Sequence, residues 1–288
     1  MKLSSRLGAP FLLFLLLSSA ILLWSCAAAS NEKEQTIDQQ LEKLAASHGI
    51  LLFFKGDPSR FFHPSWQKEP VNAKAEALTD NEKKMMLEPL QKALSLYPKS
   101  FVKSHIGSIV LLKSLSLYGS SYAGTYTVFK TPGYNLLYLT RGSVTDKDFA
   151  SFFIDSFHHE LSSVLMEMHP FPEKEWRVVN GESFKYRYEH EDSPGLSALK
   201  DDVSTGFSIQ MVANGFLSEY AMSSLEEDVN VFAAVALKDP QWMSELAADY
   251  IKIKQKLNLV MRFYVGIDKD FAQSEPYKFY RAKGLLDI

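Results

Sequence analysis

The sequence predicts an α+β fold, and two kinds of pattern support that prediction. Apolar residues recur at helical spacing over a long stretch, Phe149–His169, and again between residues 224 and 257. Residues 108–140 are instead β-like, and the stretch YAGTYTVFK at 122–130 alternates apolar and polar residues. The sequence shows no internal repeat and no low-complexity linker after residue 35. A single domain therefore accounts for most of the chain.

The N-terminal half is predicted to combine helices with short strands. An amphipathic helix is expected at 36–47. A second helix begins near Asp80, and Pro89 kinks or splits it because proline removes a hydrogen bond from a helix interior. Pro98 ends this second helix. The other expected elements are a strand at 50–54 and a small antiparallel sheet with strands at 108–117, 122–130 and 134–140.

The C-terminal half is predicted to be mostly helical. The long helix follows Thr145, which can cap its start with Asp148 three residues on, and Pro170 closes its end. The polar, aromatic segment at 172–204 is long for a loop, which predicts short strands or turns within it. Two further helices are expected, one at 224–237 and one that starts at Asp239-Pro240 and carries Trp242, Leu246, Tyr250, Ile253 and Leu257.

Length and charge restrict the functional classes. The chain has 288 residues, which is ample for one large domain with a substantial core. Its 31 basic and 34 acidic residues give a formal net charge of −3, and the acidic residues are scattered. Because neither a basic patch nor a charged tail is visible, no nucleic-acid partner is expected.

The N-terminus has the pattern of a bacterial secretory signal. Lys2 and Arg6 precede an apolar run, Phe11–Trp24, that is too short to span a bilayer comfortably. The run ends in Leu-Trp-Ser-Cys at 23–26, which resembles a lipobox, where the peptide is cut before the cysteine and the thiol is lipidated. The alternative is a plain signal peptide with an incidental cysteine.

Lipidation of Cys26 would divide the chain into a signal peptide at 1–25, a tether at 26–35 and one domain at 36–288. Acyl chains on Cys26 would anchor the protein to a membrane of the cell envelope without spanning it. Ala27 after the cysteine resembles the lipoprotein sorting pattern that favours the outer membrane. Cys26 is the only cysteine, so no disulfide is expected.

The long helix carries the densest chemistry of the chain, the consecutive residues His158, His159 and Glu160. His-Glu on a helix is the first half of H-E-x-x-H, in which two histidines hold zinc and the glutamate takes the proton of a bound water. Ser163 occupies the position of the second histidine, and a neutral hydroxyl is a poor zinc ligand. The alternative is two ordinary helix histidines, one solvated and one hydrogen-bonded.

The helical positions indicate that both sides of this helix are covered. At about 100° per residue, His159 lies opposite the main apolar stripe of the helix. Phe152 and Met166 lie on the same side as His159, so that side is not simply solvated. A helix covered on both sides is typical of an active-site helix between two subdomains.

A downstream segment, YAMSSLEED at 220–228, supplies a candidate acidic ligand. In zinc peptidases of the H-E-x-x-H…E type, the third ligand is a glutamate near the start of a later helix, and Glu227 has this position. Ser224 and Glu227 also have the spacing of a capping box, which needs no metal. Tyr220 could donate a hydrogen bond to an oxyanion or could simply pack.

The two motifs, FHHELSSVL at 157–165 and YAMSSLEED at 220–228, lie on a chain with a lipobox-like start. Together they resemble the zinc-binding metallopeptidase family of bacterial envelope lipoproteins, which has a zincin-like fold. The resemblance covers most of the mature chain. It implies a zinc cofactor, with His159 as first ligand, Glu160 as general base and Glu227 as third ligand.

The sequence departs from this family at two places, Ser163 and the Val-Asn-Val at 229–231 that replaces Phe-Ala-Glu. Asp155 lies one turn before His159 and points the same way, so it could replace the missing ligand. His158 lies about 100° round the helix from His159, which makes one tetrahedral site awkward for both. His169 has the spacing of the third metzincin histidine, although Met166 stands where a glycine turns that chain.

Three functions therefore remain open from the sequence. The first is a divergent metallopeptidase in which zinc activates water, Glu160 accepts the proton and Tyr220 stabilises the tetrahedral intermediate. The second is a pseudo-peptidase that binds a peptide or glycan at the cell surface. The third is a structural envelope protein with ordinary histidines.

Overall fold

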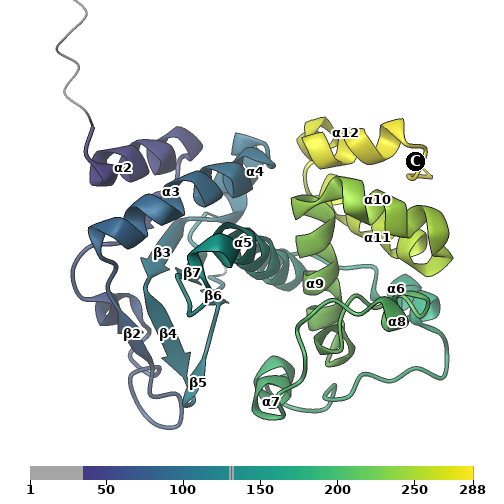
Figure 1. The fold of residues 1–288 in the computed structure, drawn as a ribbon, viewed down its shortest axis with the longest axis horizontal. Helices are drawn as coiled ribbons and strands as arrows, with labels where there is room; N and C mark the ends of the chain where they lie inside the picture. Colours follow the sequence, from purple (N-terminus) through teal and green to yellow (C-terminus); the bar gives the residue numbers. More distant parts are fainter. Residues whose placement is uncertain (1–34, 130, 132, 288) are drawn as a thin grey trace, which may run out of the picture. The chain divides into compact units, whose positions relative to one another are not determined.

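The structure is a computed structural model that describes residues 35–129, 131 and 133–287 (Figure 1). Ile37–Ile288 forms one compact unit. The predicted signal peptide at 1–25 and the predicted lipidation site, Cys26, lie outside the described residues. Among the helices of the described part, none is long and apolar enough to cross a membrane.

The larger sheet, which we call sheet A, has four strands in the order β1-β3-β7-β6. They are β1 (Leu51–Phe53), β3 (Ser108–Leu112), β7 (Leu136–Thr140) and β6 (Gly124–Thr127). The pairs β1–β3 and β3–β7 are parallel, and only β6–β7 is antiparallel. The expected antiparallel arrangement is therefore correct for β6 and β7 and wrong for β3.

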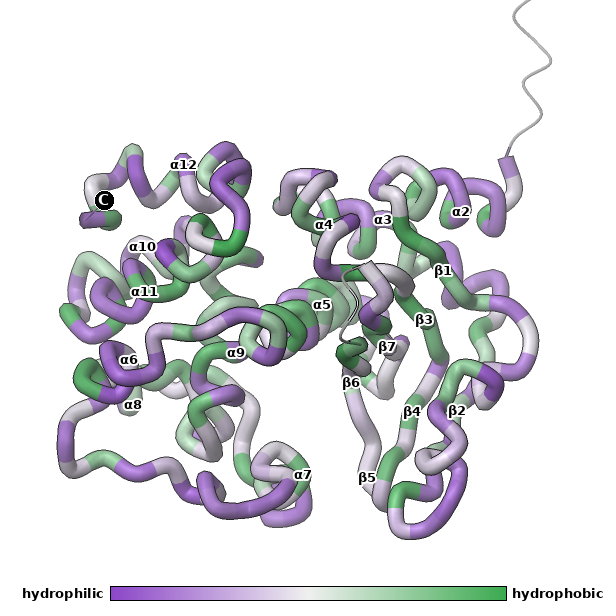
Figure 2. The backbone as a smooth tube through the Cα atoms, turned by 180° about the vertical axis from the view of Figure 1, so that it is seen from behind, coloured by the Kyte–Doolittle hydropathy of each residue, from purple (hydrophilic) through white to green (hydrophobic). Residues whose placement is uncertain are grey.

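Strand β3 shows why this sheet differs from the expected one. Ile109 and Leu111 belong to the main core with the helices, whereas Val110 and Leu112 pack in a second apolar cluster on the other face. Because both faces are covered, the strand is a continuous apolar run, as is usual for parallel strands. In Figure 2 the hydrophobic colour is strong along β1, β3 and α5.

A second sheet, sheet B, is antiparallel in the order β2-β4-β5. Its strands are β2 (Lys74–Glu76), β4 (Ser114–Leu117) and β5 (Ser120–Ser121). The run predicted as one strand at 108–117 is thus two strands that belong to different sheets. Lys113 separates them, and its backbone N–H donates to the Glu76 carbonyl.

The described residues of the N-terminal half contain three helices before strand β3. They are α2 (Ile37–His48), α3 (Asp80–Ser95) and α4 (Lys99–His105), and a short 3-10 turn, η1 (Pro58–Phe61), follows β1. Thr79 and Glu82 cap α3 reciprocally. The helix α3 continues through the buried Pro89, so it is not split. The separate helix α4 is an element that the sequence pattern does not predict, because Pro98 indicates the end of a helix.

The central helix α5 (Asp146–Met168) runs through the middle of the domain (Figure 1). It starts three residues earlier than the predicted Phe149, with Thr145 as N-cap and His169 as C-cap. It packs against α3, β6 and α9. This position between β-containing and helical parts covers α5 on both sides, as the positions of its apolar residues predicted.

The C-terminal half is helical. Its elements are α6 (Glu173–Asn180), α7 (Pro194–Lys200), α8 (Ile209–Val212), η2 (Tyr220–Met222), α9 (Leu225–Lys238), α10 (Pro240–Asp249), α11 (Ile251–Ile267), η3 (Lys269–Gln273) and α12 (Glu275–Ala282). The segment at 172–204, which is fully described, contains α6 and α7 with turns between them instead of strands. The long helix expected from Pro240 is two helices, because Tyr250 adopts an extended backbone between them.

Candidate functional site

The site is centred on two side chains from helices that pack against each other, His159 of α5 and Glu227 of α9. Their Nε2 and Oε2 atoms lie 3.2 Å apart. Ser224 is the N-cap of α9, and its hydroxyl accepts a hydrogen bond from the Glu227 backbone N–H at 3.2 Å. The cap positions the first turn of α9, while the Glu227 carboxylate contacts His159.

The contact between these two side chains is an ion pair without hydrogen-bond geometry. The Glu227 Oε2 atom is buried and has no hydrogen-bond partner in the described part of the chain. Burial alone would lower the pKa of His159, but the Glu227 carboxylate outweighs burial, and the pKa rises to about 9. At neutral pH, His159 is therefore an imidazolium facing a carboxylate.

Glu160 is buried beside sheet A. A Cβ atom at Gly124 of the edge strand β6 would lie 2.9 Å from Glu160 Cγ and 2.9 Å from the Tyr138 carbonyl oxygen, so only glycine permits this approach. Burial raises the pKa of Glu160 to about 7. A carboxyl group with a pKa near 7 can exchange a proton at neutral pH, so Glu160 keeps the acid–base property of a general base.

Ser163, at the position of the second motif histidine, is engaged by another residue. Its Oγ accepts a hydrogen bond from Asn230 Nδ2 of α9 at 2.6 Å, and both side chains are buried. Asn230 is a residue that sequence reasoning did not select, because its role depends on the pairing of α5 with α9. The hydrogen bond fills the interface between these helices where an imidazole would lie in the complete motif.

The proposed substitute ligands have other partners. Asp155 forms an ion pair with Lys238 of α9. His158 is fully buried on another side of α5, where its Nδ1 lies 2.8 Å from the Tyr97 hydroxyl. His169 lies at the end of α5 and contacts His105. His158 and His169 thus lie apart from the His159–Glu227 pair, whereas Asp155 pairs with Lys238 and also interacts electrostatically with His159.

Helix α7 closes over the site beside Tyr220. A Cβ atom at Gly195 of α7 would lie 2.2 Å from Glu227 Oε1 and 2.9 Å from the Tyr220 hydroxyl oxygen. Tyr220 is buried, and burial together with the Glu227 charge raises its pKa well above the ordinary tyrosine value. The ring of Tyr220 lies 6.5 Å from that of His159. The backbone of α7 thus fills the space next to the carboxylate.

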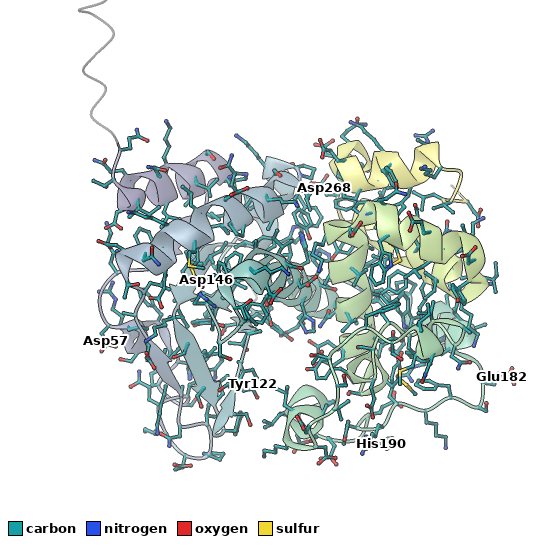
Figure 3. All side chains as sticks on the ribbon, viewed as in Figure 1. Asp57, Tyr122, Asp146, Glu182, His190 and Asp268 are labelled. Carbon is teal, nitrogen blue, oxygen red and sulfur yellow. The ribbon has the colours of Figure 1, made fainter. Side chains whose placement is uncertain are left out.

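Two tyrosines on the β side complete the surroundings of the site, and sequence reasoning gave neither a role. Tyr122, labelled in Figure 3, precedes β6, and burial with the charges of Glu227 and Glu160 raises its pKa to about 12. Tyr126 of β6 donates a hydrogen bond from its hydroxyl to Glu226 Oε1 at 3.0 Å. This bond connects the edge strand to the first turn of α9.

The residues do not fit a zinc centre of the expected kind. Catalytic zinc is held by three protein ligands and a water, and only His159 and Glu227 converge here. Within the described residues, no group of three His, Cys, Asp or Glu side chains is arranged to hold a metal ion. A metal ion at His159 would also have to displace the proton that the Glu227 carboxylate helps to hold there. We therefore derive no catalytic step through zinc.

An α+β domain with half a zinc motif on its central helix and a glutamate on a later helix is metallopeptidase-like. Residues 30–267 match the family described as "putative zinc-binding metallo-peptidase", and the chain belongs to this family. Comparison with curated proteins and with solved structures gave no significant match. The motifs therefore predicted the metallopeptidase family correctly.

Proposed function

We propose that this chain is a metal-independent, non-hydrolytic member of its family that binds a peptide at the cell envelope. The observation that carries this proposal is the 2.6 Å hydrogen bond from Asn230 Nδ2 to Ser163 Oγ. A hydroxyl that already accepts a hydrogen bond in a packed interface has little to offer a metal ion. The second ligand position of the motif is thus used for helix packing.

The charge state of the central pair supports the same proposal. The imidazolium of His159 supplies the positive charge that Glu227 would otherwise receive from a metal ion. The carboxylate of Asp155 is likewise neutralised by Lys238. The carboxylates of Glu227 and Asp155 thus each have a cationic partner within the protein.

Sheet geometry favours a peptide over a glycan as the ligand. Strand β6 forms one edge of sheet A and pairs with β7 alone in the described part of the chain. Its Gly124 lies against Glu160. An extended peptide can add to such an edge through main-chain hydrogen bonds. The proposed binding mode is strand addition along β6, next to the His159–Glu227 pair.

The proposal includes a membrane anchor. The basic start, the short apolar run and the lipobox-like residues 23–26 support lipidation of Cys26. Ala27 supports the outer membrane as its location. In this arrangement the tether holds the domain at the membrane surface, where envelope peptides would be its ligands.

One observation favours a second candidate, a divergent metallopeptidase. The Oε2 atom of Glu227 is buried without a hydrogen bond, and it lies 3.2 Å from His159 Nε2. Two ligand atoms about 2 Å from one zinc ion are separated by about this distance. In this case water would supply the remaining ligands.

Metal content decides between the two candidates. We expect the full-length chain, purified without chelator, to contain far less than one zinc per molecule by plasma mass spectrometry. Peptides pulled from an envelope peptide library should bind equally well to wild type and to Glu160→Gln, without cleavage. Stoichiometric zinc that disappears in His159→Ala would overturn the proposal and establish the metallopeptidase.

A further inference from the structure

Two histidines meet at the C-terminal ends of α4 and α5, away from the candidate site. His105 is the last residue of α4, and His169 is the C-cap of α5. Their Nε2 atoms lie 3.0 Å apart, and their rings cross at 64°. His169 is ten residues beyond His159, or about 15 Å along a helix axis. The contact therefore belongs to neither the His159–Glu227 pair nor the proposed function.

The hydrogen bond on the other side of His105 fixes its tautomer. Its Nδ1 lies 2.8 Å from the backbone carbonyl oxygen of Phe101. A carbonyl oxygen can only accept, so Nδ1 carries the proton. In the neutral ring the other nitrogen, Nε2, is then unprotonated. Its Nε2 atom then has a free lone pair, directed at His169.

This arrangement is the one that orients histidine ligands in metal sites. Such histidines donate the N–H of the non-ligating nitrogen to a backbone carbonyl or a carboxylate, which holds the ring in place. His105 is buried and rigidly oriented in this way, whereas His169 is half-buried and open to solvent on one side. One fixed ligand and one accessible ligand thus face each other.

We propose that His105 and His169 form a binding site for a divalent transition metal ion, with copper(II) as the preferred occupant. Two nitrogens 3.0 Å apart, each about 2.0–2.1 Å from a shared ion, subtend an angle of about 95° at the ion. This angle matches tetragonal copper(II) better than tetrahedral zinc. Copper(II) is also the tightest-bound first-row divalent ion at imidazole sites.

The surroundings favour a cation at this point. The carboxylate of Asp268 exerts a negative electrostatic influence on His105. Figure 3 shows Asp268 beside the end of α4, where the N-terminal helices meet the C-terminal ones. In the described residues no third His, Cys, Asp or Glu joins the two histidines as a ligand group. Water on the open side of His169 would therefore complete the coordination, and the ion would be exchangeable.

The competing explanation is a hydrogen bond from His169 Nε2–H to His105 Nε2. The two explanations differ in what copper does. A hydrogen bond alone gives no stoichiometric copper binding and no spectroscopic signature. A metal site gives one bound ion whose electron paramagnetic resonance spectrum shows hyperfine splitting from two imidazole nitrogens.

The test is a titration of the full-length chain with copper(II) chloride, followed by calorimetry and electron paramagnetic resonance. We expect one equivalent with two-imidazole hyperfine structure, and at least tenfold weaker binding in both His105→Gln and His169→Gln. The exposed His190, labelled far from Asp268 in Figure 3, provides the matched control His190→Gln, which should bind as wild type. Zinc should bind more weakly than copper.

His159→Gln separates this proposal from the proposed function, because copper binding at His105 and His169 should survive that substitution. Circular dichroism establishes that each variant is folded, and His169→Gln, at a half-buried position, preserves the test if the buried His105 variant unfolds. Copper affinity in His169→Gln equal to that of wild type, or no stoichiometric copper in wild type, would overturn the site.

Discussion

Two neighbouring carboxylates in the first turn of α9, Glu227 and Asp228, have opposite surroundings. Asp228 Oδ2 accepts hydrogen bonds from Trp176 Nε1 at 2.8 Å and from the Tyr186 hydroxyl at 2.8 Å. The ammonium of Lys256 lies 2.8 and 2.7 Å from the two Asp228 oxygens. Both charged residues are completely or almost completely buried. Glu227, by contrast, forms its ion pair with His159 and keeps a buried oxygen without a hydrogen bond from the described residues.

These different surroundings indicate different roles. Asp228 stabilises the fold, whereas Glu227 is available to a ligand. A buried charge with all its hydrogen bonds made stabilises a specific arrangement, and removing one partner strands the other. A buried carboxylate with an unused acceptor retains capacity for a ligand, and such groups cluster at functional sites. Burial alone would not have distinguished these two residues.

The largest expected effect is on stability at Asp228. We expect Asp228→Asn to lower the free energy of unfolding by about 3–5 kcal/mol, because Lys256 remains as an uncompensated buried charge. Glu227→Gln, the matched control one residue away, should cost less, because Glu227 makes one ion pair and its Oε2 atom has no hydrogen bond within the described residues. Urea unfolding monitored by circular dichroism measures both, and equal losses would contradict the comparison.

The next largest expected effect is on zinc affinity, when the zinc motif beside Glu227 is completed. Ser163→His with Asn230→Ala places a second imidazole one turn from His159 and removes the amide that now bonds Ser163. We expect zinc affinity to rise by about 10- to 100-fold over wild type, the size of change that single groups make at metal sites. Zinc titration by calorimetry checks this. Asn230→Ala alone should show no gain, and Glu227→Gln in the double variant should remove it.

A moderate effect is expected where α7 meets Glu227. Gly195→Ala would place a methyl group 2.2 Å from Glu227 Oε1, so either α7 or the Glu227 side chain must shift. We expect a loss of about 2 kcal/mol, as for an overpacked site, and faster proteolysis within residues 190–206. Gly266→Ala in α11 is the control, because a Cβ added there would meet no described atom within 4 Å and alanine favours helix. Unchanged stability in Gly195→Ala would show that α7 does not press on the site.

The smallest effect is on the pH dependence of stability. It distinguishes His159, the partner of Glu227, from its neighbour His158. Burial lowers the pKa of His158 to about 3, below the usual value near 6.5, so the stability from neutral His158 is lost as pH falls below 6.5. The pKa of His159 is raised to about 9, so the stability from its charged form is lost as pH rises from 6.5 to 9.

The measurement is the free energy of unfolding at pH 5.5, 6.5 and 8.5. His158→Gln should flatten the acid side by about 1 kcal/mol between pH 6.5 and 5.5, because one proton is linked to unfolding there. His159→Gln should instead flatten the alkaline side. The same slope change in both variants would show that the two rings do not differ as described.

The sequence predicted the long helix well because its periodicity is local. Thr145 is the N-cap of α5, and the helix ends at Met168, just before Pro170. The direction of β3 was not predicted, although its continuous apolar run is usual for parallel strands covered on both faces. Helix α6 was missed, since the segment after Pro172 is rich in polar residues.

The candidate site was predictable only in part. Motif spacing selected His159 and Glu227, and the structure places them 3.2 Å apart. Asn230 and Gly195 are invisible to such reasoning, because an asparagine in a helix and a glycine after a proline have no special meaning until α5, α7 and α9 are packed together. Spacing along one helix reveals neighbours on that helix and not the side chains that face it.

The hydrogen bond between Asn230 and Ser163 also constrains the routes that mutation can follow from this sequence. A histidine at 163 introduced first would crowd the α5–α9 interface, at a cost of about 1–3 kcal/mol. An alanine at 230 introduced first would leave a buried hydroxyl without its partner, at a cost of about 1–3 kcal/mol. Either substitution made alone lowers stability, and metal binding compensates for this loss only when both are present. Substitutions at these two positions are therefore epistatic, and the chain is separated from a complete zinc motif by a fitness valley.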